Sequence, residues 1–204
     1  MIPVTVQNLQ YLANADPALC RGLGAKKGHS SLALLSTDCD DATYIALDQA
    51  TKAAEVEVCF GRSFYAGGTN LPGAGEVLGI LAGRTPGAVR SGMEAALAML
   101  EQVGFEDLGG IPCLAYTVSS TGSYLSAEAG IRLGEPLAYL IAPPLEAMYA
   151  LDAALKAADV RLAKLYAPPS ETNFGGALLT GTRSACSAAC DAFREAVAKG
   201  RAGR

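Results

Sequence analysis

Two spacings of apolar residues alternate along the chain, and together they predict alternating strands and helices. Ser31–Ser36 and Leu137–Ala142 are nearly continuous apolar runs, which is typical of buried strands. After Thr85-Pro86, apolar residues recur every three or four positions and predict an amphipathic helix that ends at Gly104. The apolar face of that helix contains Val89, Met93, Ala96, Leu97 and Leu100.

Shorter apolar or alternating segments predict the other strands, which are Ile2–Val6, Glu55–Phe60, Glu76–Ala82, Leu114–Ser119, Val160–Tyr166 and Ala177–Gly181. Helical spacing within Asn8–Gly22 is interrupted at Asp16-Pro17, where Asp16 can cap a short helix that starts at Pro17. Thr121–Leu125 and Gly130–Gly134 are expected to be a loop and a turn, and Ser184–Val197 is expected to be the last helix.

One helical segment occurs twice. Ala46–Val58 reads ALDQATKAAEVEV, and Ala150–Leu162, found 104 residues later, reads ALDAALKAADVRL, with eight of the 13 paired positions identical. Alanines match easily between helices, but the shared spacing of Leu, Asp, Lys, an acid and Val indicates an internal duplication. In both copies an Asp precedes a Lys by four residues, Asp48 with Lys52 and Asp152 with Lys156, and we expect each to be a surface pair.

The duplication divides the chain into two similar halves. Each half follows the order strand, short helix, strand, helix, strand, loop, strand, helix. This predicts an α/β (α+β) fold with a first domain at residues 1–105 and a second at residues 106–204. Each domain is small for independent stability, so we expect the two to pack as pseudo-symmetric partners.

Composition indicates a protein that associates with copies of itself. Half of the 204 residues are apolar, 18% are charged, and the mean hydropathy is +0.25. No apolar run is long enough to span a bilayer and no signal peptide precedes the first strand, so we expect a cytoplasmic protein without a membrane partner. The surplus of apolar residues favours oligomerisation. A net charge of −4 without a basic stripe argues against nucleic acid as a partner.

The cysteines and the single histidine do not suggest a metal centre. None of the six cysteines forms a CxxC pair, although Cys186 and Cys190 share a helical face. Buried free thiols in a reducing compartment are the simpler interpretation. His29 has no motif around it and is expected to be a surface or turn residue, so we expect no catalytic residue, no metal and no resident cofactor.

Two glycine-containing loops and one group of acids remain open to two interpretations. The loops Tyr65–Gly75 and Pro168–Gly176 are either mobile surface connections or gates. Asp38, Asp40 and Asp41 start the first repeated helix, where acids favour the helix dipole and an Asp can cap the helix. Three carboxylates in four residues are more than one cap requires, and Glu76, at the start of a strand, is either a solvated strand end or a further part of a binding site.

Several long motifs resemble a known family. DDATYIALDQAT, GRSFYAGG, TGSYLS, AYLIAPPLEAMYALDAALKAADV, APPSETNF and LLTG followed by ACSAAC are similar to the tandem-domain shell proteins of bacterial microcompartments, which are carboxysome-like structures. The similarity is strongest to the L type of ethanolamine-utilisation shell proteins and extends from about Val4 to Val197. It implies two tandem circularly permuted bacterial microcompartment (ferredoxin-like) domains per chain. It also implies that three chains form a pseudo-hexagonal homotrimer, which meets other shell proteins edge to edge in the microcompartment shell.

The resemblance also implies pores that pass small metabolites such as ethanolamine. Its ammonium group favours carboxylates and an aromatic face, and the residues expected to bind it are Asp40, Asp41, Glu76, Phe105 and Tyr65. Under this interpretation the two loops are gates, with Gly67, Gly68, Thr69 and Asn70 in the first and Glu171, Thr172, Asn173 and Phe174 in the second. A corrinoid such as cobalamin is a further expected effector, near Thr180 and Arg183 with Phe174.

Two other functions are compatible with parts of the sequence. The serines of TGSYLS and GTRSAC could act as nucleophiles in an enzyme, but neither is accompanied by a positioned base. A sensor built from duplicated α/β domains, which binds an amine or a corrinoid without a shell role, fits the same residues. Assembly distinguishes the sensor from the shell protein, because a sensor forms a discrete oligomer and does not tile.

Overall fold

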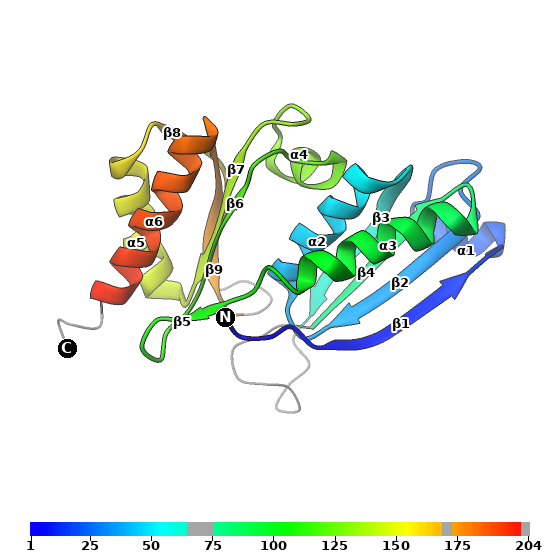
Figure 1. Ribbon diagram of the computed structural model, residues 1–204, viewed down its shortest axis with the longest axis horizontal. Helices are drawn as coiled ribbons and strands as arrows, with labels where there is room; N and C mark the ends of the chain where they lie inside the picture. Colours follow the sequence, from blue (N-terminus) through cyan, green and yellow to red (C-terminus); the bar gives the residue numbers. More distant parts are fainter. Residues whose placement is uncertain (65–75, 169–172, 201–204) are drawn as a thin grey trace. The chain divides into compact units, whose positions relative to one another are not determined.

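The computed structural model describes residues 1–64, 76–168 and 173–200, which fall into two compact units (Figure 1). The N-terminal unit contains Pro3–Val103 and Gly122–Leu125, and the C-terminal unit contains Met1–Ile2, Gly104–Thr121 and Ser126–Arg204. The predicted domain boundary between residues 105 and 106 stays a prediction. The mixed α/β fold class is confirmed, since both units consist of an antiparallel sheet with helices. The Tyr65–Gly75 gate loop lies outside the described residues.

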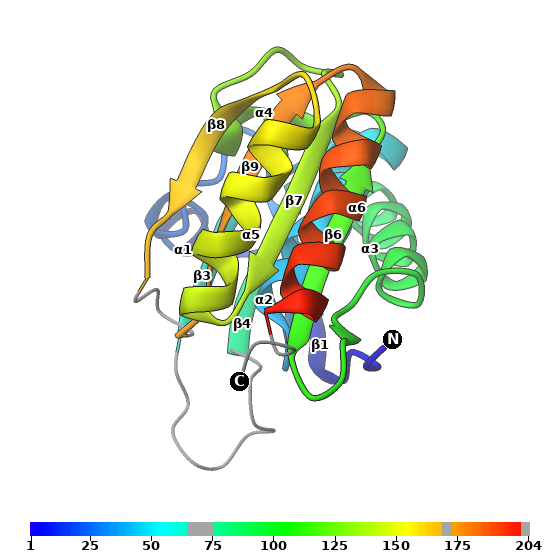
Figure 2. The same cartoon turned by 90° about the vertical axis from the view of Figure 1, so that its left-hand side faces the viewer.

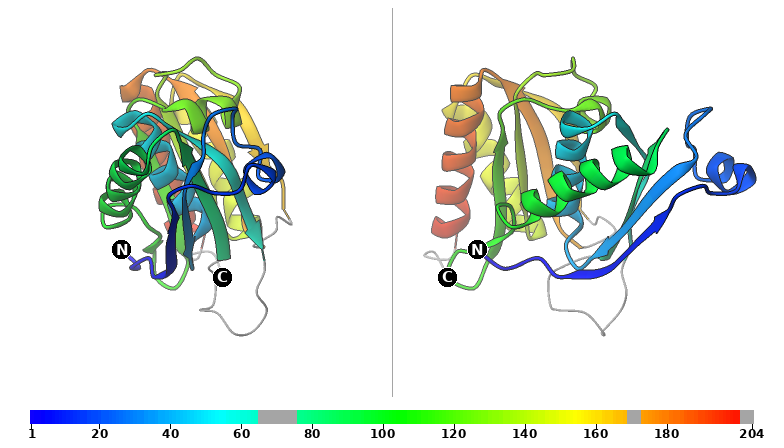
Figure 3. Two further views of the ribbon diagram at one scale, coloured as in Figure 1. Left: turned by 90° about the vertical axis from the view of Figure 1, so that its right-hand side faces the viewer. Right: turned by 45° about the vertical axis from the view of Figure 1, so that its right-hand side comes forward.

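The N-terminal unit contains a four-stranded antiparallel sheet in the order β1-β2-β4-β3. Its strands are β1 (Val6–Leu12), β2 (Ser31–Thr37), β3 (Val56–Phe64) and β4 (Glu76–Gly83). Two long helices, α2 (Asp40–Ala53) and α3 (Pro86–Leu100), pack against each other and against one face of this sheet (Figure 1). The short helix α1 (Pro17–Gly22) follows β1 at its far end (Figure 3), where Cys20 packs on Leu32 and Ile80.

The C-terminal unit repeats this arrangement in a five-stranded sheet in the order β5-β6-β7-β9-β8. Its strands are β5 (Glu106–Asp107), β6 (Pro112–Val118), β7 (Leu137–Ala142), β8 (Val160–Tyr166) and β9 (Gly175–Gly181). Helices α5 (Pro144–Ala157) and α6 (Arg183–Lys199) lie side by side on one face (Figure 2). The core between them and the sheet is built from small residues around Phe193, which is fully buried.

The duplication predicted from the repeated helix is confirmed by backbone details in both units. A β-bulge interrupts the β3–β4 pairing between Val58 and Phe60, and the same irregularity interrupts β8–β9 between Leu162 and Lys164, 104 residues later. The turns after the two short helices also match. Glycines with positive φ occur at Gly24 and Gly28 and again at Gly130 and Gly134, an offset of 106 residues. The repeat therefore includes the short helices and turns as well as the long ones.

The beginning of the chain differs from its prediction. The predicted strand at Ile2–Val6 and the helical spacing from Asn8 were wrong, because the strand covers Val6–Leu12 and only Pro17–Gly22 is helical. Pairing of β1 with β2, Leu9 opposite Leu35 for example, outweighs local spacing in this polar segment. The cap was predicted correctly, since the Asp16 carboxylate accepts a hydrogen bond from the Ala18 N–H at 2.7 Å.

Two other predicted boundaries were wrong. Strand β3 continues to Phe64, beyond the predicted end at Phe60, because its register with β4 extends to Glu76. The segment predicted as a loop at Thr121–Leu125 contains the start of helix α4 (Ser123–Ala129). That helix occupies the position of α1 in the other repeat, so comparison of the two halves would have found it.

Candidate functional site

The start of α2 holds the acids that the sequence singled out. Cys39 is the N-cap residue, and no side chain caps the helix, so the interpretation of Asp40 as a cap was wrong. The Oδ1 atom of Asp40 instead accepts a hydrogen bond from the Asp41 N–H at 2.9 Å. Asp38 serves the neighbouring strand, where its Oδ1 accepts from the Thr5 N–H at 2.7 Å. All three carboxylates are buried, each with 6–7% of its surface exposed.

Sheet register brings Glu76 to the same end of the N-terminal unit. Thr37, the last residue of β2, lies opposite Val77, the second residue of β4. Asp38, which follows β2, and Glu76, which begins β4, therefore lie at the same end of two neighbouring strands. Glu76 also lies opposite Phe64, the last residue of β3. The Nε2 atom of Gln7 donates a hydrogen bond to Glu76 Oε1 at 3.2 Å. Asp38, Asp40, Asp41 and Glu76, which we call the acidic cluster, therefore gather around one end of this sheet.

The three aspartates of the acidic cluster create a negative environment around the Cys39 thiol. Burial raises the pKa of the Cys39 thiol well above its ordinary value, and the negative charges of Asp41, Asp40 and Asp38 raise it further. Hydrogen bonding to the backbone at Ala42 offsets this only in part. Because nearby carboxylates disfavour a second negative charge, they favour a positive one at the same place. The arrangement suits a small cation.

The second repeat shows that the fold does not require these acids. With the offsets of 104 residues for the helix and 98 for the last strand, Pro144, Leu145 and Phe174 occupy the positions of Asp40, Asp41 and Glu76. Helix α5 nevertheless begins normally from Pro143, without a side-chain cap. Since the equivalent helix forms with proline and leucine at these two positions and a single acid, Glu146, in its first turn, helix initiation does not account for the whole acidic cluster.

The aromatic residues expected at the site have separate surroundings. Phe105 belongs to the C-terminal unit and packs against Phe174, with 5.3 Å between the ring centroids, and both side chains are buried. The role of Phe105 in binding a cation stays a prediction. Asn173 adopts a positive φ of 62° immediately before Phe174. Tyr65 and the gate residues Gly67, Gly68, Thr69, Asn70, Glu171 and Thr172 lie outside the described residues.

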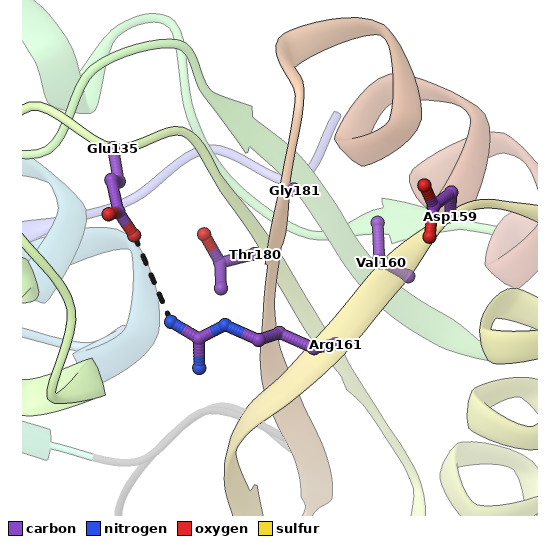
Figure 4. A pocket seen from close by; sticks show the side chains of 6 residues that line it. All are labelled: Glu135, Asp159, Val160, Arg161, Thr180 and Gly181. Carbon is purple, nitrogen blue, oxygen red and sulfur yellow. Dashed lines mark ion pairs between the residues drawn. The ribbon is translucent and has the colours of Figure 1, made fainter.

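Of the proposed corrinoid contacts, Thr180 lines an open hollow of about 380 Å³ in the C-terminal unit (Figure 4). Thr180 is buried, however, and its hydroxyl donates a hydrogen bond to the Pro136 carbonyl at 2.8 Å. An ion pair between Arg161 and Glu135 crosses the hollow, with 3.8 Å between Arg161 Nη2 and Glu135 Oε2. Arg183 is the first residue of α6. Corrinoid binding at these residues stays a prediction.

The single histidine is a hydrogen-bonding partner of Glu57, which is more specific than the surface or turn residue that was predicted. The Nδ1 atom of His29 lies 2.8 Å from Glu57 Oε1, and Lys26 Nζ lies 3.0 Å from Glu57 Oε2. Burial raises the pKa of the Glu57 carboxyl. Hydrogen bonds from the Lys26 backbone and side chain, together with the charges of Lys26 and His29, outweigh burial and lower this pKa below its ordinary value of 4.5.

Replacing Glu57 by glutamine is expected to lower the free energy of unfolding by about 1 kcal/mol at pH 7. Because the folded-state pKa is lowered, the contribution of Glu57 is complete above about pH 4.5 and is lost as the pH falls below that value. Urea unfolding of both proteins between pH 7 and pH 3.5 measures the difference. The gap should be constant at neutral pH and close in acid; a gap that widens in acid would contradict the assignment. Glu195→Gln, in an exposed pair, is the matched control.

The cysteines behave largely as the sequence predicted. All six are free; five are buried and Cys59 is half-buried. Burial raises the pKa of Cys59 and Cys190 to about 11 and that of Cys113 to about 12. Such thiols are almost entirely protonated near neutral pH and react slowly. Within the described ranges, no group of three or more His, Cys, Asp or Glu side chains is arranged to hold a metal.

One structurally important residue was assigned wrongly from the sequence. Asp48 was expected in a surface pair with Lys52, but its side chain is fully buried. Its Oδ2 accepts from the Gly122 N–H at 2.7 Å and its Oδ1 from the Leu125 N–H at 2.8 Å. Lys52 Nζ lies 3.5 Å from the same carboxylate. The repeated Asp152 does form the expected surface pair, 2.6 Å from Lys156 Nζ. No local pattern separates the two aspartates.

Comparison with known proteins places this geometry in one family. The model of the BMC domain matches residues 31–109. The bacterial microcompartment shell protein EutL of Clostridium perfringens (strain 13 / Type A) is 56% identical over 203 residues, which cover 97% of this chain and 94% of that protein. EutL of Escherichia coli (strain K12) is 50% identical, with coverage of 97% and 93%.

Solved structures give the same result. The crystal structure of EutL from Clostridium perfringens aligns with a TM-score of 0.94 over 98% of this chain and 94% of that one. The ethanolamine utilization protein EutL from Leptotrichia buccalis is 53% identical, also with a TM-score of 0.94, over 98% and 95%. A trimeric bacterial microcompartment shell protein, PduB, shares the fold at 21% identity, with a TM-score of 0.81 over 96% and 88%.

Proposed function

The chain belongs to the EutL family of bacterial microcompartment shell proteins, and from this we propose that it forms a trimeric shell tile whose pores pass small cationic metabolites. Membership of a microcompartment shell family, which the sequence motifs predicted, is confirmed by full-length identities of 48–56%. The trimer, its pores and their permeant are the parts that we propose.

The observation that carries the proposal is the duplicated unit in a chain of this family. A homo-oligomer closes most simply by rotation about one axis. Three chains with two similar units each place six units around such an axis, and a pseudo-hexagon tiles a plane without gaps. PduB, which has the same fold, is described as trimeric. Several large apolar side chains are exposed in the single chain and require a partner, among them Leu145, Tyr149, Leu162 and Leu165.

For the permeant we propose an amine such as ethanolamine, bound by the acidic cluster. Buried carboxylates without a structural counterpart in the second repeat attract an ammonium group, and Glu76 can accept a hydrogen bond from a hydroxyl or an amine. The Leptotrichia buccalis relative is called an ethanolamine utilization protein, which agrees with that substrate class. Phe105 and Tyr65 supply the proposed aromatic contacts, the two long loops act as gates, and a corrinoid binds near Thr180 and Arg183 as an effector.

An enzymatic function has little support. The relatives are named as shell proteins, and the one histidine of the chain is engaged by Glu57. In the described ranges, every helix is too short or too polar to cross a bilayer. The relatives named above are shell proteins, which favours the tile over a free amine or corrinoid sensor.

Light scattering coupled to size exclusion, with negative-stain microscopy of concentrated protein, tests the proposal. We expect a mass of three chains of 20.8 kDa each, and hexagonally ordered sheets at high concentration. A trimer that never forms sheets, alone or with other shell proteins, would favour the sensor. A monomer would contradict the tile outright.

A further inference from the structure

The N-terminal unit has an open hollow of about 320 Å³, which we call the N-terminal hollow. It lies where β4 ends, next to Gly83, whereas the acidic cluster lies where β4 begins, at Glu76. The two sites are therefore at opposite ends of one sheet, and they share no lining residue. The charged residues that line the N-terminal hollow are Lys26, His29, Glu55, Glu57 and Arg84.

One acid of the hollow, Glu57, is already satisfied by its neighbours. Glu57 Oε1 accepts a hydrogen bond from the Lys26 N–H at 2.7 Å and lies 2.8 Å from His29 Nδ1, and Glu57 Oε2 lies 3.0 Å from Lys26 Nζ. Burial raises the pKa of Glu57, but the hydrogen bonds and charges of Lys26 and His29 outweigh burial and lower it. The surroundings of this carboxylate are thus positive on balance.

Arg84 is a cation of the hollow that no acid neutralises. Within the residues that the structure describes, its guanidinium forms no ion pair and no hydrogen bond. It lies beside the turn at Gly28, where a Cβ atom would be 3.5 Å from Arg84 Nη1. Gly28 has a positive φ of 88°, which favours glycine, so bare backbone faces the guanidinium on that side. Arg84 therefore presents donors that the described part of the chain does not use.

The other acid of the hollow, Glu55, does not take this role. It is exposed in the turn between α2 and β3, where solvent and salt screen its charge. In the described ranges, no ion pair joins Glu55 to Arg84 or Lys26. Lys27, exposed in the turn that also contains Lys26, adds a further positive charge at the rim. The free charge that is fixed in the hollow is thus positive.

The C-terminal unit has an equivalent hollow, the one of about 380 Å³ described above (Figure 4). Val160 lines it as Val56 lines the N-terminal hollow, and these two residues pair with Gly181 and Gly83 at the ends of their sheets. Both hollows are therefore products of the duplicated fold. The differences between them identify features that the fold does not require.

The charges of the two hollows are arranged differently. Glu135 takes the place of His29, because each residue ends the same backbone turn, and Arg161 takes the place of Glu57. The arginine of the C-terminal hollow therefore has an acid as its partner, with 3.8 Å between Arg161 Nη2 and Glu135 Oε2 (Figure 4). In that hollow the guanidinium is engaged within the protein.

Arg84 itself has no counterpart in the second repeat. There the cap residue Thr182 follows Gly181 directly, whereas Arg84 stands between Gly83 and the cap residue Thr85. One extra residue at this junction thus supplies the unneutralised cation. Since α6 starts from its threonine cap without such a residue, the start of α3 does not require Arg84.

We propose that the N-terminal hollow binds a small oxyanion, a carboxylate or phosphate group, through the guanidinium of Arg84, with the Lys26 ammonium as a second donor. A guanidinium offers two parallel N–H groups that match two oxygens of such a group. The Lys26 side chain is 73% exposed, and its ammonium has donors beyond the one directed at Glu57. A volume of about 320 Å³ suits a ligand of small-molecule size. The ligand class is an anionic metabolite, distinct from the amine proposed for the acidic cluster.

Titration of inorganic phosphate with the intact protein, followed by ³¹P NMR at constant ionic strength, tests the site. We expect saturable binding that Arg84→Gln weakens at least about five-fold, because it removes both the charge and the paired donors. Arg84→Lys keeps the charge alone and should lie between the two. Arg90→Gln is the matched control, since the Arg90 guanidinium lies over the Tyr11 ring in the same unit, 4.7 Å from its centroid. This control should bind phosphate as the wild type does.

Glu57→Gln separates a binding role from a structural one. This variant removes a negative charge from the hollow, so phosphate binding should strengthen about two-fold even though the folded protein is less stable. Weaker phosphate binding in Glu57→Gln would contradict the site, because a purely structural effect lowers binding in every destabilised variant.

Competition by acetate identifies the kind of oxyanion. Acetate that displaces phosphate at equal or lower concentration assigns the site to carboxylates, and acetate that requires a higher concentration assigns it to phosphate groups. An absence of saturable binding of either anion to the wild type, unchanged binding in Arg84→Gln, or an equal loss in Arg90→Gln would overturn the oxyanion site. These results leave the shell tile and the acidic cluster untouched, because those are tested by assembly and by ethanolamine.

Discussion

Replacing Asp40 by alanine together with Glu76 by alanine is expected to abolish ethanolamine binding while the trimer stays folded. Both residues belong to the acidic cluster, at one end of the N-terminal sheet. A hydrogen bond to a charged partner contributes about 1.5–3 kcal/mol, so loss of two carboxylates should weaken binding more than about 100-fold. Isothermal titration calorimetry with ethanolamine measures this loss.

The size of the ligand determines how the titration is designed. Very small ligands gain at most about −1.5 kcal/mol per non-hydrogen atom, which for ethanolamine limits the affinity to a Kd of about 40 μM. Binding must therefore be measured at high protein concentration. The control is Asp191→Ala with Glu195→Ala, which removes the same charge from exposed positions on α6. Unchanged binding in the Asp40/Glu76 variant, or equal loss in the control, would reject the acidic cluster as the amine site.

Replacing Asp48 by alanine should produce the largest loss of stability of any single acidic residue discussed. It would leave the buried N–H groups of Gly122 and Leu125 without their acceptor, at about 1–3 kcal/mol each. We expect the free energy of unfolding to fall by about 2–4 kcal/mol. Asp48→Asn keeps one acceptor oxygen and should lose about half as much. Urea unfolding at one fixed protein concentration measures both, because assembly shifts apparent stability.

Glu195→Ala is the matched control for this series. Glu195 and Lys199 have the same spacing of four residues in a helix as Asp48 and Lys52, but the Glu195 pair is exposed, whereas Asp48 is buried. Its loss should change stability by less than about 0.5 kcal/mol. If Asp48→Ala behaved like Glu195→Ala, the carboxylate would not hold the start of α4 in solution.

Much of the architecture was predictable from the chain alone. The repeated helix, the buried strands β2 and β7 and the Asp16 cap all follow from spacing and side-chain chemistry within a few residues. The long family motifs supplied what spacing cannot, since they identified the family before any geometry was known. The gathering of Asp38, Asp40 and Asp41 was visible in the sequence because these residues are neighbours.

Other features depended on pairing between distant segments. Strand β1 has helix-like spacing and becomes a strand because β2 offers an open edge, where six of the seven β2 residues pair with β1. Glu76 joins the acidic cluster only through the register of β2 with β4. Neither fact has a signal within a short window of sequence, because strand pairing is decided by partners that lie tens of residues away.

The two repeated aspartates show where determination by sequence ends. In both copies the sequence determined an amphipathic helix with an Asp and a Lys four residues apart, and both helices formed as predicted. Only the tertiary structure decided that Asp48 is buried beneath Gly122–Leu125 and that Asp152 stays in water. The reason is physical: helical spacing specifies which side chains share a face, whereas burial of that face depends on whether another segment covers it.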